Sequence, residues 1–152
     1  MSKEPQGGIS NDFVTFQIGE QLFGVPIGDV QDVFKPQRLT PVPLSHPDVA
    51  GVLNLRGRIV TMIDCRQHLG LGKSKYEGMM AVGVERGNES YGLLIDKIGD
   101  VLSLDPSTLE ANPVNLDTRW RAVSKGVYRL EHRLLIVLNI STILDFGKRE
   151  AA

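Results

Sequence analysis

The chain has little of what disulfide-bonded proteins, metalloproteins and membrane proteins use. Cys65 is the one cysteine among 152 residues, which excludes an internal disulfide and favours a reducing cytoplasm. The three histidines lie in no metal-ligand spacing, so we expect no metal site. A net charge of −1 provides no general attraction to nucleic acid or to an anionic membrane. The longest uncharged apolar run, Leu134–Leu138, is far too short to cross a bilayer, so we expect no direct membrane insertion.

Sequence motifs of catalysis are also missing. Neither phosphate-binding glycine motif occurs, and there is no G-x-S-x-G nucleophile turn. His68 stands near Arg66 and is interpreted as a surface residue. Asp29, Asp32, Asp96 and Asp100 are interpreted as solvated or turn-capping carboxylates. We therefore expect no enzyme, no catalytic residue and no cofactor.

What the chain does contain is an internal repeat at two different shifts. At a shift of 68 residues, Phe23-Gly24 falls on Tyr91-Gly92, and at a shift of 75 residues, Gly51-Val52 falls on Gly126-Val127. Further matched pairs are Val14 with Val82, Phe16 with Val84, Ile27 with Ile95, Val33 with Val101, Arg58 with Arg133 and Asp64 with Asn139. Two similar small units are indicated, with a groove between them as the first place to look for function.

Each unit is expected to consist of short strands, glycine-containing turns and one short helix. The predicted hairpins turn at Gly19-Glu20, Arg56-Gly57 and Gly87-Asn88, with a fourth hairpin after Val127. Asp64 and Asn139 are expected to cap short helices, and the spacing of Val30, Val33 and Phe34 suggests a helical turn. The segment 35–50 contains four prolines and is predicted to cross the molecule in an extended form. The predicted boundaries are a flexible tail over 1–12, one domain over 13–146 with subdomains near 13–70 and 79–146, a linker over 71–78, and a second tail over 147–152.

This pattern predicts an all-β fold of two small barrels, SH3-like or OB-like, on a shared apolar interface. One continuous sandwich is the alternative. An OB-like barrel also raises the possibility of a nucleic-acid-binding protein, although such proteins need aromatic platforms and a basic groove. Aromatic residues make up only 6% of the chain. The basic residues near Trp120 are interpreted either as a solvated face or as a protein-binding rim.

Arg56 has three possible roles at the tip of its hairpin. It is a plain turn residue, or it pairs with an acid such as Asp32, or it recognises a partner at the mouth of the groove. The spacing of residues alone does not separate these roles.

The segment from Ala50 to Asp64, with Asn54-Leu55-Arg56-Gly57 at its turn, resembles the signature of the CheW-type chemotaxis coupling proteins. The resemblance extends to Val30-Gln31-Asp32-Val33, to Asp100-Val101-Leu102 and to the strand from Arg133 to Asn139, and so covers about residues 13–146. The Asn-Leu-Arg-Gly block is its most specific part.

The resemblance implies two five-stranded β-barrels on a shared hydrophobic core, with short helices and with segments that can be exchanged between the halves. It implies a non-enzymatic cytoplasmic adaptor, recruited to membrane receptor arrays, that couples the helical hairpin at a chemoreceptor tip to the regulatory domain of the histidine kinase CheA. A CheW-like adaptor of another chemosensory pathway, such as twitching motility, is the alternative. Carried over by position, the expected receptor-groove residues are Val30, Asp32, Gly51, Leu53, Arg56 and Ile98.

Overall fold

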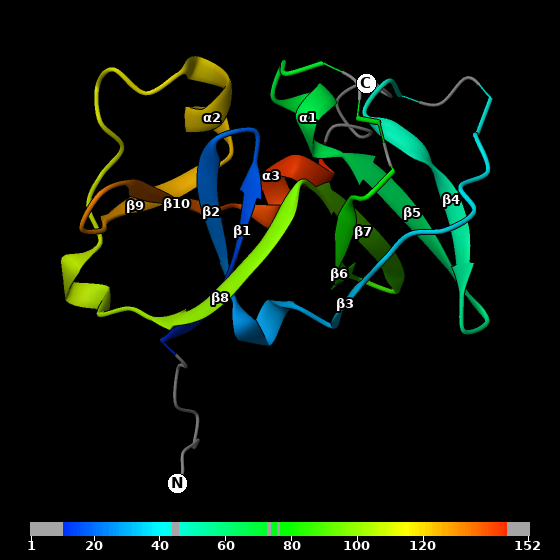
Figure 1. Ribbon diagram of the computed structural model, residues 1–152, viewed down its shortest axis with the longest axis horizontal. Helices are drawn as coiled ribbons and strands as arrows, with labels where there is room; N and C mark the ends of the chain where they lie inside the picture. Colours follow the sequence, from blue (N-terminus) through cyan, green and yellow to red (C-terminus); the bar gives the residue numbers. More distant parts are fainter. Residues whose placement is uncertain (1–10, 44–45, 73, 76, 146–152) are drawn as a thin grey trace, which may run out of the picture.

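Two five-stranded β-sheets stand side by side in the computed structural model, which describes residues 11–43, 46–72, 74–75 and 77–145. Sheet A has the strand order β8-β1-β2-β10-β9 and sheet B the order β3-β6-β7-β5-β4. In Figure 1, sheet A lies on the left and sheet B on the right. The predicted tails over 1–12 and 147–152 fall almost wholly outside the described residues, although β1 already begins at Asp12.

The elements are short, as their glycine- and proline-rich boundaries require. Sheet A contains β1 Asp12–Ile18, β2 Gln21–Pro26, β8 Lys97–Ser103, β9 Ser124–Arg129 and β10 Leu134–Leu138. Sheet B contains β3 Asp32–Phe34, β4 Val49–Leu55, β5 Arg58–Asp64, β6 Met80–Arg86 and β7 Glu89–Ile95. The helices are α1 Cys65–His68, α2 Thr118–Ala122 and α3 Ile140–Leu144, with 3₁₀ turns η1 Ile27–Asp29 and η2 Pro106–Thr108.

The two sheets do not follow the sequential division into 13–70 and 79–146. The chain leaves sheet A after β2, builds all of sheet B from β3 to β7, and then returns to complete sheet A. Parallel pairing joins the exchanged parts, β2 with β10 and β5 with β7. Local turn signals predict each hairpin but carry no information about which distant strand lies beside it, so the sequence alone left the exchange open.

The internal repeat is visible in the backbone. Gly51 and Gly126, related by the shift of 75, have φ of 151° and 144°. A Cβ atom on Gly51 would lie 2.6 Å from the carbonyl oxygen of Thr40, and one on Gly126 would lie 2.8 Å from that of Glu110. Both glycines thus permit a close crossing of the preceding segment over a strand. The predicted caps are confirmed: the side chain of Asp64 accepts from the Gln67 N–H, and that of Asn139 accepts from the Thr142 N–H.

Apolar side chains form one core between the sheets and a smaller core on the far side of each. The central core takes residues from both sheets, including Phe16 and Phe23 from sheet A and Ile63 and Leu93 from sheet B, all fully buried. Phe34, Leu53 and Met62 belong to the outer core of sheet B, and Phe13 and Tyr128 to that of sheet A. Neighbouring residues of a strand supply opposite faces, so β5 buries Met62 in one core and Ile63 in the other.

One local expectation was wrong. The helical turn predicted from Val30, Val33 and Phe34 lies earlier, at η1, and Val33 and Phe34 belong to β3. Three apolar residues fit either periodicity, and pairing with β6 decides for the strand. The connection between β8 and β9 contains η2 and α2. Ile59, close to the turn between β4 and β5, is 63% exposed.

Candidate partner-binding site

The hairpin between β4 and β5 presents Arg56 at its tip. Arg56 and Gly57 have φ of 54° and 84°, which is the left-handed pair of a two-residue hairpin turn. Arg56 is the only residue other than glycine with a positive φ in the part of the chain that the structure describes. The side-chain oxygen of Asn54 accepts from the Gly57 N–H at 2.9 Å and closes the turn. The Asn-Leu-Arg-Gly block is therefore a turn whose geometry directs one arginine outward.

Arg56, at the turn between β4 and β5, forms an ion pair with Asp32 of β3 in the same sheet. Its Nη1 lies 3.2 Å from the Oδ2 of Asp32, with side-chain exposures of 76% and 30%. A pair this exposed stabilises a fold by only about 0.2–1 kcal/mol because water screens it. The pair therefore contributes little stability, and its main effect is to hold the guanidinium over β3.

Gly83 of β6 leaves the space that the Asp32 carboxylate occupies. A Cβ atom at Gly83 would lie 2.3 Å from the Oδ1 of Asp32. Asp32 is paired with Gly83 across the strands, and the Gln31 N–H donates to the Gly83 carbonyl at 2.8 Å. Gly83 was not among the predicted site residues, although a glycine inside a predicted strand is a signal of close approach.

A pocket of about 420 Å³ opens beneath Arg56. Its polar lining includes Asp32, Arg58, Ser90 and Tyr91, with Phe34, Leu55 and Val60 as apolar wall. The Arg58 Nη2 donates to the Ser90 hydroxyl at 2.5 Å. Partial burial and a 2.6 Å hydrogen bond to Glu89 raise the pKa of Tyr91 to about 12, and the phenol donates its proton in that bond to the Glu89 carboxylate.

The other predicted groove residues lie elsewhere. Gly51 is buried under Thr40, and Leu53 is 7% exposed within the outer core of sheet B. Val30 is half-buried against the central core, and Ile98 of β8 is 41% exposed. The pocket beneath Arg56 includes none of these four side chains. The structure therefore brings Arg56 and Asp32 together, without placing the remaining four around the same pocket.

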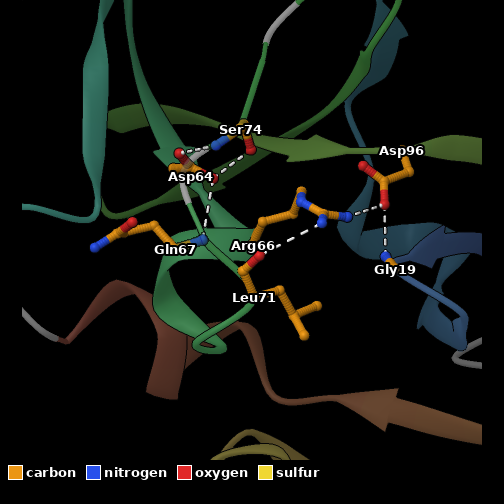
Figure 2. A network of polar contacts seen from close by, with 7 residues as sticks. All are labelled: Gly19, Asp64, Arg66, Gln67, Leu71, Ser74 and Asp96. Atoms are coloured by element: carbon orange, nitrogen blue, oxygen red, sulfur yellow. Dashed lines mark hydrogen bonds and ion pairs between the residues drawn. The ribbon is translucent and has the colours of Figure 1, made fainter.

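Figure 2 shows a polar network that the sequence analysis did not anticipate. The Asp96 carboxylate, just after β7, accepts from the Gly19 N–H in the β1–β2 turn at 2.5 Å and from Arg66 of α1 at 2.8 Å. It thus connects sheet A with sheet B and α1. The buried Asp64 carboxylate accepts from the Ser74 N–H at 2.9 Å and from the Ser74 hydroxyl, besides capping α1.

Two of the arginines near Trp120 are engaged by groups of the same chain. Arg121 donates to the Val114 carbonyl at 2.6 Å, and Arg129 pairs with Glu110 at 3.1 Å. Trp120 packs edge-on against the buried Phe23, with ring centroids 6.1 Å apart. Its indole is half-buried and packs in part against the central core.

Among the described residues, no cluster of three histidine, cysteine or acidic side chains is arranged to hold a metal ion. His68 contacts the Asp48 carboxylate at 2.6 Å, which ties α1 to the residue before β4. Burial raises the pKa of the Cys65 thiol, with the Asp64 carboxylate as a second cause, so the thiol stays protonated. None of the described helices has the length and hydrophobicity to traverse a lipid bilayer.

Comparison with known proteins gives concordant matches over nearly the whole chain. The family model of the CheW-like domain matches residues 12–147. Chemotaxis protein CheW of Thermotoga maritima is 28% identical over 88% of this chain and 87% of its own, and that of Treponema pallidum is 30% identical over 87% and 81%. The crystal structure of the scaffolding protein TtCheW from Thermoanaerobacter tengcongensis superposes with a TM-score of 0.77 at 27% identity, over 91% of this chain and 90% of that one. Protein PilI of Pseudomonas aeruginosa is 27% identical over 81% of this chain and 70% of its own.

Proposed function

Because this chain belongs to the CheW-like domain family, we propose that it is a non-enzymatic adaptor that couples chemoreceptor tips to the histidine kinase CheA. The observation that carries the proposal is the agreement between the family match over residues 12–147 and the structural match to a scaffolding protein. In this role the chain acts in the cytoplasm and is recruited to receptor arrays at the membrane.

Within this function, Arg56 is the receptor contact that the geometry supports best. It projects from a rigid turn, is largely exposed, and lies beside a pocket with both polar and apolar walls. A helical hairpin that docks at such a rim buries an apolar stripe and uses a few polar groups to fix its register. Asp32 orients Arg56, and Gly51 and Leu53 keep β4 in place. Val30 and Ile98 do not line this pocket, and in this proposal the receptor contacts their apolar side chains beyond it.

The decisive experiment measures both partners separately. Purified chain is titrated with the CheA regulatory domain and, independently, with a receptor cytoplasmic fragment. The variant Arg56→Ala should weaken receptor binding about fivefold to tenfold, as expected for loss of an interface arginine. Binding to the kinase domain should be unchanged.

Arg129→Ala is the matched control for this experiment, since Arg129 is also an exposed, acid-paired arginine but lies on sheet A. Failure of the wild-type chain to bind the kinase domain at tens of micromolar would contradict the adaptor function. Equal receptor binding by Arg56→Ala and wild type, with both folded, would contradict only the groove.

A second candidate is an adaptor of a different chemosensory pathway, such as twitching motility. The similarity to Protein PilI, a relative with a different name from the CheW proteins, is the observation that favours it. Titration against the kinases of each pathway present in the source organism separates the two, since the cognate kinase should bind most tightly.

A further inference from the structure

An open groove of about 570 Å³ lies between residues 34–40 and strand β4. One wall carries Lys35 and Arg38, and the other carries Val52 and Asn54, with Ile59 at the rim. Arg56 does not line this groove, although Phe34 and Leu55 line both the groove and the pocket beneath Arg56. A scaffold that holds two partners at once needs a second surface of this kind.

The floor of the groove is an incompletely paired sheet edge. β4 is the last strand of sheet B, and on its outer side the backbone of Val52 exchanges hydrogen bonds with Thr40 at 2.8 and 2.9 Å. Backbone groups two residues apart in a strand point to the same side, so the N–H and carbonyl of Asn54 also face outward. In the part of the chain that the structure describes, no backbone group pairs with them. The edge can therefore accept an extended segment.

The side chains around this edge define the chemistry of the occupant. Ile59 is 63% exposed, and Val52 and Leu55 are half-buried, so the groove offers apolar surface. Lys35 and Arg38 are exposed, no acidic residue lines the groove, and no described carboxylate forms an ion pair with either cation. The groove thus matches a segment that is apolar and negatively charged.

We propose that this groove is a docking site for an extended protein segment that carries apolar and acidic side chains in alternation. The segment lies along β4 and pairs with the backbone of Asn54. Its apolar side chains pack on Ile59 and Val52, and its carboxylates face Lys35 and Arg38. Alternation follows from strand geometry, because successive side chains point to opposite sides.

A defined peptide tests the proposal on the full chain. The probe is a fluorescein-labelled octapeptide of alternating valine and glutamate, blocked at both ends, with binding read by fluorescence anisotropy. Two comparison peptides replace glutamate by lysine or carry N-methyl groups on alternate backbone nitrogens. We expect saturable binding of the glutamate peptide below about 1 mM, perturbation of the Val52 and Asn54 amide signals in NMR spectra, and no saturable binding of either comparison peptide.

Variants of the chain show which side chains contribute to binding of the peptide. Arg38→Glu should weaken binding of the glutamate peptide at least about fivefold, because an attraction becomes a repulsion. Lys125→Glu, an exposed lysine on β9 of sheet A, is the charge control and should leave binding unchanged. Ile59→Ser should also weaken binding, whereas Val114→Ser, at a 94% exposed valine outside the groove, should not.

Any one of three results overturns the proposal. They are the absence of saturable binding, equal binding of the lysine or N-methylated peptide, and undiminished binding to Arg38→Glu. Arg56→Ala should bind the peptide as the wild type does, so this test stands or falls independently of the receptor contact.

Discussion

At the scale of single residues, Gly83 illustrates how an absent side chain shapes the candidate site. Its position opposite Asp32 leaves room for a carboxylate that a methyl group would displace. Asp32 in turn positions Arg56 at 3.2 Å. The absence of a side chain at Gly83 therefore determines, through Asp32, where the Arg56 guanidinium lies on the surface.

The substitution Gly83→Ala tests this arrangement. The new methyl group would meet the Asp32 carboxylate at 2.3 Å, so the carboxylate must move and the pair with Arg56 should be lost. We expect a loss of about 1 kcal/mol or more in the free energy of unfolding, as for overpacking at a closed position, measured by urea denaturation.

Gly28→Ala is the control for this prediction, because nothing lies within 4 Å of a Cβ atom there and its φ is ordinary. That variant should be within about 0.5 kcal/mol of wild type. If the two variants unfold at the same urea concentration, the close approach at Gly83 has no energetic consequence.

At the scale of elements, the two repeated helix starts have the same cap but different surroundings. Asn139 accepts from one N–H at the start of α3, whereas Asp64 at the start of α1 is buried and also accepts from the backbone and hydroxyl of Ser74. Among the described residues, the capping side chain therefore also binds a residue outside its helix in the first repeat, at Asp64, and not in the second, at Asn139.

The two cap substitutions should therefore differ in cost. Asn139→Ala should lower the free energy of unfolding by about 1 kcal/mol, the usual value for a lost cap. Asp64→Ala should cost more, about 2–4 kcal/mol, because the buried Ser74 N–H loses its acceptor in addition to the partly buried Gln67 N–H. Chemical denaturation of both variants measures the difference, and equal costs would show that the contact with Ser74 adds nothing.

At the scale of the whole molecule, the exchange of segments makes the two sheets interdependent. β1 and β2 complete a sheet whose other strands follow β7, and the central core takes buried side chains from both sheets. Asp96 adds a polar connection between the β1–β2 turn and α1. Sheet B is built from the contiguous residues 32–95, and sheet A from strands on either side of that stretch, so neither sheet can form from residues 1–78 alone or from residues 79–152 alone.

Cutting the chain in the connection between α1 and β6 tests this interdependence. Residues 1–78 lack β10 beside β2 and β7 beside β5, and residues 79–152 lack the matching partners. Each fragment alone should show no cooperative unfolding transition in circular dichroism, since it lacks the partner strands and the buried side chains that complete its core. Co-expression of both fragments should restore a folded complex, and a folded isolated fragment would contradict the argument.

Much of the fold and part of the site could be predicted from local residues. Glycine turns, strand alternation and the Asp64 and Asn139 caps act over a few neighbours, so the hairpins and short helices were recognisable. The same holds for Arg56, whose place at the turn follows from Gly57. Val33 and Phe34 were assigned to the wrong element because three apolar residues fit a helix and a strand equally well.

By itself, the amino-acid sequence determined the repeat, the β class and the turn that carries Arg56, because each depends on interactions within one hairpin or one helix start. Only the tertiary structure decided that β2 lies beside β10 and β5 beside β7, that Leu53 belongs to the core, and that Asp32 meets both Gly83 and Arg56. The reason is physical: alternating apolar residues bury one face against any complementary surface, and the choice among distant surfaces is made by the packing of the complete core.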